Sequence, residues 1–365
     1  MNRLIIILLT SILFSCNTDA VISENPNTKS TGFPAINSDY WETLSPDSLG
    51  WNTEAIPELK KLLEDNGTRA FLLIKDGKIV LEEYFGKDLF GISKFDKTKR
   101  WYWASAGKTL TAFTVGLAQE HGFLNINDKT SDYLGKKWTS LTPEQEDKIT
   151  IRHQLTMTSG LDDSKSGGNS LAPSNLKYKA DAGTRWAYHN APYTLLEKVV
   201  TNATGKEFDD YFSEKLADKI GMDGIWRWLG EYHIFFSTAR SMARFGLLML
   251  NNGDWNGEPI MKDKEFLKAM INPSQDLNES YGYLWWLNGK ESFMLPQTQL
   301  IFKGSLTPEA PADMFSGLGK NGQYISIVPS MNLVLIRMGE NPEDSDIAAM
   351  FQRKIWEKLN KIMKR

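Results

Sequence analysis

A serine and a lysine three residues apart have the types and spacing to do chemistry. Ser105 and Lys108 precede an apolar stretch, residues 110–121, whose periodicity predicts a helix, so both side chains should face one side of its first turn. A serine hydroxyl needs a base, and a lysine serves only where burial or positive charge lowers its pKa toward neutrality. The helix N-terminus opposes a nearby ammonium and offers free N–H groups to an oxyanion. The pair therefore predicts nucleophilic acyl transfer.

The spacing alone leaves other interpretations open. Ser174 and Lys177 match the same pattern by chance, inside a Ser-, Gly- and Asn-rich segment, residues 162–179, that is predicted to be a surface loop. At Ser105 a helix N-cap followed by a solvated lysine would give the pattern too. A phosphate-binding loop ending at residues 106–109 is disfavoured, because it would need a glycine where Tyr102 stands.

A second motif, Tyr188-His189-Asn190, favours a nucleophile at Ser105 over a helix N-cap. With Ser105 and Lys108 it resembles the β-lactamase and penicillin-binding-protein superfamily of serine hydrolases, which combines S-x-x-K with Y-x-N or S-D-N and a K-T-G-like strand. The Y-x-N form resembles the branch of class C β-lactamases, D-alanyl-D-alanine carboxypeptidases, esterases and 6-aminohexanoate-dimer hydrolases. Residues 149–161 and 237–246 are also similar to that branch, and the resemblance runs from about residue 53 to residue 362.

The resemblance implies a role for each residue of this motif. Tyr188 would pass the serine proton to the leaving group, and Asn190 would position Lys108 or the substrate carbonyl. The alternative for Tyr188 is a core aromatic whose hydroxyl is hydrogen-bonded. His189 would face away from the site in an extended segment and is interpreted as structural.

The third motif departs from the usual pattern. Counting back from the predicted strand 323–328 places it at Gly317-Leu318-Gly319, which lacks the usual cation. The alternative, Lys320-Asn321-Gly322, leaves too few residues before the strand. The resemblance implies an oxyanion hole made by the backbone N–H groups of Ser105 and Lys320. Without the cation that holds a substrate carboxylate, an ester or amide substrate is favoured over a β-lactam.

Aromatic residues gather around these motifs and predict either an apolar acyl pocket or core packing. Only Tyr102 and Trp186 are predicted to lie near the site, with Asn190 and the third motif, as substrate-binding residues. The tryptophans in question are Trp101, Trp103, Trp186, Trp226, Trp228, Trp285 and Trp286.

Elements at the two ends of the chain must hold this site. A helix over residues 53–65 and a hairpin of strands 70–74 and 78–85 come first, and strands 323–328 and 333–338 and a helix over 345–364 come last. Helices are predicted between them at 110–121, 151–158, 191–204 and 237–251. We therefore predict an α/β fold of the α+β type, and the resemblance implies the β-lactamase/transpeptidase-like one. Segments of about 53–100 and 280–365 would share an antiparallel sheet, with a mainly helical subdomain, about 101–279, inserted.

The N-terminal residues predict export and lipid anchoring. Residues 1–15 have the charge and the short apolar run of a signal peptide, and Cys16, the only cysteine, resembles a lipidated lipoprotein cysteine. Residues 16–39 are predicted to be a flexible tether before the hydrolase domain, residues 40–365. The expected location is extracytoplasmic, anchored by lipid on Cys16 to a bacterial membrane.

Composition narrows the possible functions. With a formal net charge of −3 and no basic stripe, nucleic acid is not an expected partner. The four histidines lack ligand spacing, so neither a metal nor another cofactor is expected, and no obligate protein partner is inferred. The prediction is a serine hydrolase that cleaves an ester or amide of a small substrate through a Ser105 acyl-enzyme. A D,D-peptidase or β-lactamase, acting on cell-wall peptides or β-lactams, and a non-catalytic binding module are the alternatives.

Overall fold

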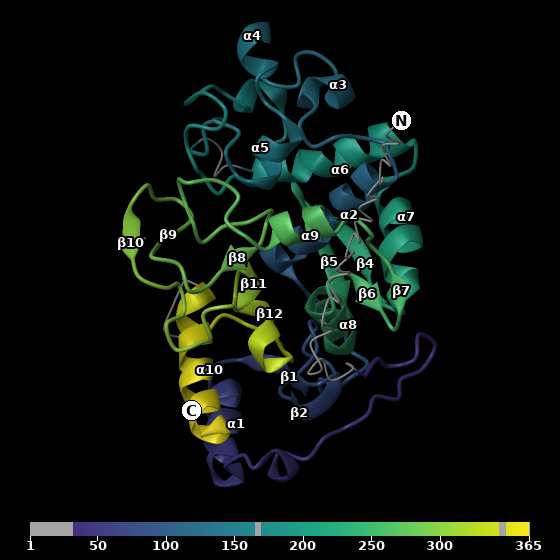
Figure 1. Cartoon of the computed structure of the whole chain (residues 1–365), viewed down its shortest axis with the longest axis vertical. Helices are drawn as coiled ribbons and strands as arrows, with labels where there is room; N and C mark the ends of the chain where they lie inside the picture. Colours follow the sequence, from purple (N-terminus) through teal and green to yellow (C-terminus); the bar gives the residue numbers. More distant parts are fainter. Residues whose placement is uncertain (1–31, 165–168, 343–347, 365) are drawn as a thin grey trace, which may run out of the picture. The chain divides into compact units, whose positions relative to one another are not determined.

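The computed structural model describes residues 32–164, 169–342 and 348–364 (Figure 1). Its main sheet has six antiparallel strands in the order β2-β1-β13-β12-β11-β8. The strands of this sheet are β1 (Thr68–Lys75), β2 (Lys78–Tyr84), β8 (Trp286–Leu287), β11 (Phe315–Gly319), β12 (Gln323–Val328) and β13 (Leu333–Gly339). The prediction that both chain ends share one antiparallel sheet is confirmed, because β1 pairs directly with β13.

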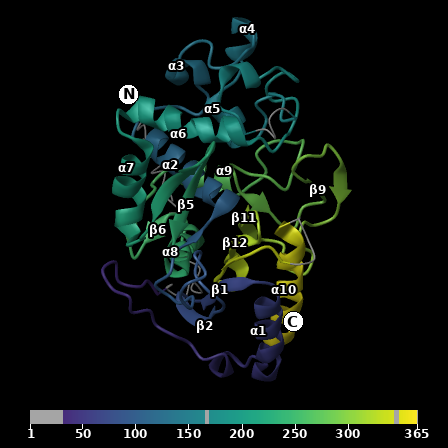
Figure 2. The same cartoon turned by 180° about the vertical axis from the view of Figure 1, so that it is seen from behind.

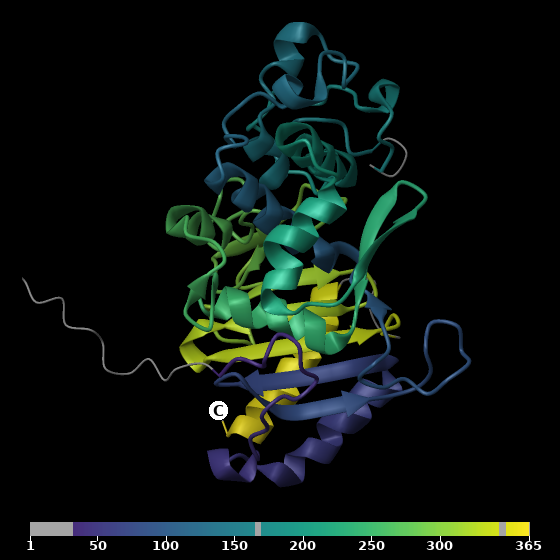
Figure 3. The same ribbon diagram turned by 90° about the vertical axis from the view of Figure 1, so that its right-hand side faces the viewer.

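Helices cover both faces of this sheet, and this explains its uninterrupted burial. On one side α1 (Ile56–Asp65) lies beside α10 (Ala348–Met363), and on the other α8 (Ala239–Leu250) packs on β12 and β13 (Figures 1 and 3). Every residue of β11, β12 and β13 is buried, as expected for strands enclosed on both faces. The main hydrophobic core joins this sheet to the inserted region, because one cluster contains residues of β1 and β13 together with residues of the inserted helices.

The inserted region carries the helices around the site (Figure 2). Its helices are α2 (Lys108–Glu120), α3 (Thr130–Leu134), α4 (Pro143–Glu146), α5 (Ile151–Leu155), α6 (Asn190–Thr204), α7 (Phe208–Phe212) and α9 (Lys264–Met270). It is less purely helical than predicted, because a second sheet has the order β3-β5-β4. Its strands are β3 (Trp101–Tyr102), β4 (Ile225–Leu229) and β5 (Tyr232–Ser237). Two further hairpins pair β6 (Asp254–Trp255) with β7 (Glu258–Pro259) and β9 (Ser292–Met294) with β10 (Ile301–Lys303).

The last part of the predicted tether is bound to the fold instead of being free. The guanidinium of Arg244 donates hydrogen bonds to the carbonyl oxygens of Ala35 (2.8 Å) and Ser38 (3.2 Å). The ring of Phe33 meets that of Trp255 edge-on at 4.8 Å. The predicted boundary at residue 39 is therefore too late, because these contacts begin at residues 32–38; the composition that suggested a tether does not reveal them.

No helix within the described ranges is long and apolar enough to span a bilayer.

Strand β11 lies directly against η3, the short 3-10 helix that contains Ser105 (Ala104–Gly107). A Cβ atom added to Gly319 would lie 2.5 Å from the carbonyl oxygen of Trp103 and 3.0 Å from the backbone nitrogen of Ala106. Only a residue without a side chain permits this approach, so the glycine sets the distance between sheet and nucleophile segment.

This contact predicts that Gly319→Ala destabilises the fold by about 1–3 kcal/mol, because the added methyl group must push β11 away from η3. Gly107→Ala is the matched control, since a Cβ there meets nothing closer than 3.8 Å. Urea unfolding followed by circular dichroism would measure both free energies of unfolding. Equal stability of the two variants would contradict the proposed close contact.

Candidate active site

The segment that carries the predicted nucleophile turns sharply between β3 and α2. Ala104 has a φ of 47°, a left-handed conformation that is unusual for a residue with a side chain. Ser105 follows in η3, and Lys108 begins α2. Such strain is concentrated at functional sites, and here it brings the partly exposed Ser105 and the buried Lys108 to one side of the turn.

The amine of Lys108 bonds to two residues of the predicted site. Its Nζ lies 3.1 Å from the Oγ of Ser105 and donates to the Oδ1 of Asn190 at 2.8 Å. It also lies 4.1 Å from the ring centroid of Tyr193 and 5.0 Å from that of Tyr188. Lys108 forms no ion pair in the described ranges, so the groups that hold the amine in place are neutral.

Burial lowers the pKa of Lys108 to about 7, and the nearby Glu197 carboxylate opposes this shift. Removing an ammonium from water disfavours the charged form. At neutral pH a substantial fraction of Lys108 is therefore the free amine, which can accept the proton of Ser105. The environment thus satisfies the condition under which a lysine acts as a base.

Tyr188 lies beside this pair, just before α6. Burial raises the pKa of its hydroxyl, although part of the residue is exposed, and a hydrogen bond with Ser105 opposes the shift. Its ring stacks on that of Trp286 at 5.9 Å and meets Tyr281 edge-on at 6.2 Å. Tyr188 therefore remains a phenol at neutral pH. It can donate a hydrogen bond or relay a proton, whereas the amine of Lys108 is the group that can accept one.

Asn190 connects the lysine to a loop that the sequence did not connect with the site. While its Oδ1 accepts from Lys108, its Nδ2 donates to the Oδ1 of Asn169 at 2.8 Å. This second bond determines which end of the amide faces the amine. The predicted surface loop 162–179 thus contributes Asn169 to the site, whereas Ser174 in the same loop is exposed.

The two candidate positions for the third motif lie at the end of β11 and in the turn that follows it. Strand β8 pairs with β11 only at Phe315 and Ser316, so the edge from Gly317 onward faces η3 instead. A Cβ at Gly317 would lie 3.0 Å from the Thr109 side chain and 3.2 Å from the Ala106 carbonyl. Gly317, Leu318 and Gly319 therefore run along the nucleophile segment. Lys320-Asn321-Gly322 forms the turn into β12, and Lys320 is its first residue.

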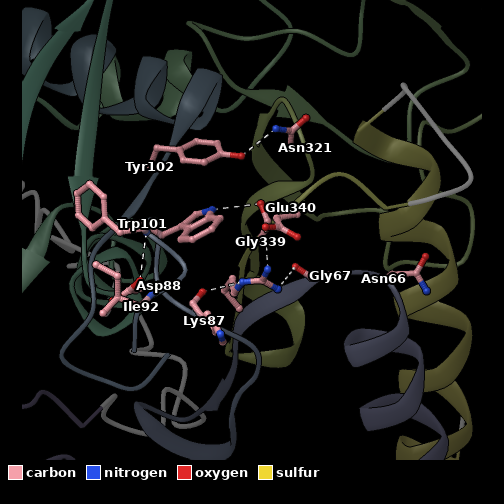
Figure 4. Close-up of polar contacts among 12 residues, drawn as sticks. Asn66, Gly67, Lys87, Asp88, Ile92, Trp101, Tyr102, Asn321, Gly339 and Glu340 are labelled. Atoms are coloured by element: carbon pink, nitrogen blue, oxygen red, sulfur yellow. Dashed lines mark hydrogen bonds and ion pairs between the residues drawn. The ribbon is translucent and has the colours of Figure 1, made fainter. Parts of the chain in front are cut away.

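The two aromatic residues predicted to lie near the site occupy different places. The Tyr102 hydroxyl accepts a hydrogen bond from the Asn321 Nδ2 at 2.8 Å, at the turn after the third motif (Figure 4). Trp186 is buried, with its ring 6.5 Å from Tyr188, so it supports the tyrosine from behind. Its carbonyl accepts from Gln299 at 3.1 Å, which brings the loop before β10 beside the site.

Most of the other tryptophans have packing roles. Trp103 donates to the Oγ of Ser237 at 2.8 Å, and Trp101 to the carbonyl oxygen of Gly339 at 3.1 Å. Trp228 is 53% exposed on β4, too open to line an enclosed pocket. Core packing therefore accounts for much of the clustering in the sequence. The buried remainder comprises Trp226, Trp285 and Trp286, of which Trp286 stacks on Tyr188.

A buried acid and histidine behind the lysine were missed from the sequence. The Oε2 of Glu197 lies 2.7 Å from the Nδ1 of His233, and its Oε1 has no hydrogen-bond partner among the residues that the structure describes. Burial raises the pKa of Glu197 to about 7. Asn190, Tyr193 and Glu197 are three and then four residues apart, so they lie on one face of α6. This helical spacing is the signal in the sequence that could have revealed Glu197.

The remaining histidines do not take part in the site. His189 is buried, and burial lowers its pKa to about 4, so it is neutral at pH 7. His153 caps α5 together with Thr150. No group of three or more potential ligands among the described residues is arranged to hold a metal ion. Cys16 lies outside the described residues.

The β-lactamase family matches residues 62–350, which include the whole constellation described above. The chain belongs to this family. This is the family that the sequence resembles, and it belongs to the serine hydrolase superfamily.

Several known proteins are similar to this chain. An uncharacterised protein of Alkalihalophilus pseudofirmus is 25% identical over 312 residues, covering 77% of this chain and 86% of that protein. A Bacillus anthracis protein, provisionally assigned as a 6-aminohexanoate-dimer hydrolase, has a similar structure with a TM-score of 0.67 at 20% identity, covering 90% and 89% of the two chains. A penicillin-binding protein of Bacillus halodurans gives a TM-score of 0.60 at 18% identity, covering 82% and 99%. These structures share the fold.

The depressed pKa of Lys108 predicts a pH dependence for the reaction of Ser105 with a fluorophosphonate. Below pH 7 the amine is protonated and cannot take the serine proton, so the labelling rate should fall about tenfold per pH unit; above pH 7 it should level off. Stopped-time labelling between pH 5 and 9 measures this. The variant Lys108→Arg, whose side chain stays charged, should be labelled slowly at every pH in this range. A labelling rate of the wild type that does not change between pH 5 and 9 would exclude Lys108 as the base.

Glu197 predicts a second pH effect. Its carboxylate raises the pKa of Lys108, so Glu197→Gln should lower that pKa and move the acidic limb of the labelling profile to lower pH. Glutamine preserves a hydrogen-bonding oxygen for His233. The control is Glu207→Gln, an exposed glutamate, which should leave the limb unchanged. An unchanged limb in Glu197→Gln, or one moved to higher pH, would show that the carboxylate does not act on Lys108.

Proposed function

We propose that this protein is a serine hydrolase that cleaves an ester or amide bond of a small substrate through an acyl-enzyme on Ser105. The observation that carries the proposal is the Lys108 amine, buried without a carboxylate partner and 3.1 Å from the Ser105 hydroxyl. A structural lysine would be expected to stay in solvent or to form an ion pair. Membership of the β-lactamase family supports the same conclusion.

The first step is attack of the Ser105 Oγ on the carbonyl carbon. The Lys108 amine takes the proton, while the Asn190 carbonyl group holds the amine in position. The oxyanion is stabilised by the backbone N–H groups of Ser105 and Lys320, whose segments lie against each other. Tyr188 then relays a proton to the leaving group, and water, activated by the same groups, hydrolyses the acyl-enzyme.

The third motif supports an uncharged region of substrate near β11. Gly317, Leu318 and Gly319 provide backbone groups and one apolar side chain but no cation. A carboxylate-bearing substrate such as a β-lactam would lose a charge-assisted hydrogen bond there, the stronger kind. Esters and simple amides have no such requirement and are the favoured substrates.

The proposed location follows from the N-terminal residues alone. We retain export and lipidation of Cys16 as a proposal, which attaches the hydrolase to a membrane outside the cytoplasm. Metabolic labelling of the expressed chain with a palmitate analogue, compared with Cys16→Ala, tests it.

Fluorophosphonate labelling of the wild type, Ser105→Ala and Ser174→Ala tests the nucleophile. We expect labelling to disappear only in Ser105→Ala, because Ser174 and Lys177 are both exposed, so burial does not favour the neutral amine there. Turnover of p-nitrophenyl butyrate should be lost in the same variant, and nitrocefin cleavage should be slow in the wild type. Labelling that survives in Ser105→Ala would refute the proposal. Rapid nitrocefin cleavage, or stable trapping by labelled penicillin, would instead indicate a β-lactamase or D,D-peptidase.

A further inference from the structure

The loop between β2 and β3 presents the two most exposed large apolar side chains in the described part of the molecule. Phe90 is 84% exposed and Ile92 is 81% exposed, and Leu89 beside them is 41% exposed. Exposed apolar residues scattered singly need no explanation, but three within four residues at the tip of one loop form a patch. Figure 3 shows this loop projecting from the body of the molecule.

The loop is ordered by its own hydrogen bonds, so the exposure is not a consequence of a loose segment. The carboxylate of Asp88 accepts from the backbone N–H groups of Phe90 (3.2 Å) and Ile92 (3.0 Å) and from the Ser93 hydroxyl (2.5 Å). The backbone N–H of Asp88 donates to the Ser93 carbonyl at 2.9 Å. The tip is thus held in one conformation, with its apolar side chains turned outward.

The base of the loop is fixed to the core. Phe95 is fully buried and meets the Trp101 ring edge-on at 5.7 Å. The guanidinium of Arg69 donates to the Lys87 carbonyl at 2.9 Å and to the Gly67 carbonyl at 3.2 Å. The loop is therefore fixed to the body of the protein, and a surface that binds its tip would hold the whole domain.

Basic residues flank the apolar tip in the sequence. Residues 86–100 contain five basic and two acidic residues, in a chain whose formal net charge is −3. The basic residues are Lys87, Lys94, Lys97, Lys99 and Arg100. Arg100 pairs with Asp223 at 3.0 Å, whereas none of the four lysines forms an ion pair within the described ranges. The local net charge is therefore positive, opposite in sign to that of the whole chain, and the four lysines can interact with an anionic surface.

A second exposed apolar tip projects on the same side. At the turn of the β4–β5 hairpin Trp228 is 53%, Leu229 52% and Tyr232 41% exposed. Strand β5 pairs with β3, the strand that follows the loop, and Figure 3 shows both tips on one side of the molecule. Tryptophan and tyrosine are the residues enriched at membrane–water interfaces.

From these observations we propose that the loop 86–95 is a membrane-docking element that inserts Phe90 and Ile92 into an anionic lipid surface. A bilayer accepts a protruding apolar tip without a matching cleft, and its anionic headgroups complement the unpaired lysines, each worth about 1 kcal/mol near such a surface. A protein partner would need a pocket shaped to this tip. The inference is independent of the reaction proposed above.

Site-specific fluorescence tests the proposal on the full chain. Cys16 is the only cysteine, so Cys16→Ala allows a single environment-sensitive NBD label at Phe90→Cys. The matched control carries the label at Ile301→Cys, a position 65% exposed on the hairpin of β9 and β10. With phosphatidylglycerol-containing vesicles, the label at position 90 should brighten and shift to the blue, and the label at 301 should not.

Charge and lipid composition provide the further readouts. Vesicles of phosphatidylcholine alone should give a weaker response at position 90. In the double variant Lys94→Gln/Lys97→Gln, the concentration of anionic lipid that gives half of the maximal response should rise about 25-fold. Equal responses at positions 90 and 301, or none at 90, would overturn the proposal. A response at 90 that grows with protein concentration in the absence of lipid would overturn it in favour of contact between copies of this chain.

Discussion

The burial of one amine, that of Lys108, is the constraint on which the rest of the site depends. Its two neutral hydrogen-bond partners are Ser105, 3.1 Å away, and Asn190, 2.8 Å away. A buried ammonium with no carboxylate partner is unfavourable, so the fold supports the amine in its neutral form. The same environment keeps Tyr188 a phenol. A group able to accept a proton and a group able to donate one are thereby provided by different residues.

The large sheet provides the rigidity that this arrangement needs. Strand β1, near the start of the chain, pairs with β13, near its end, and β11 in the same sheet lies against the segment of Ser105. Gly319 makes that approach possible. The predicted site therefore joins the sheet to the inserted helices, and movement between these two parts would separate Ser105 from β11.

Sequence patterns predicted individual helices and strands better than the pairing between distant segments. The predicted helices over 110–121 and 191–204 and the strands 323–328 and 333–338 agree with α2, α6, β12 and β13 within a few residues. These segments have strong apolar periodicity or continuous apolar runs. The small sheet of β3, β5 and β4 was not predicted. Strand β3 has two residues and pairs with β5 across more than a hundred residues, where local propensity gives no signal, and the adjacent hairpin of β4 and β5 was missed.

By itself, the sequence determined the reactive residue types and their order: a serine and lysine one helical turn apart, a later tyrosine and asparagine, and a glycine-rich strand without a cation. Residues within one turn, or on one strand, have relative positions that local geometry dictates. Only the tertiary structure decided the environment of Lys108, the contribution of Asn169, and the Glu197–His233 pair behind the site. Burial and long-range electrostatics depend on which segments meet in space, and no local spacing encodes that.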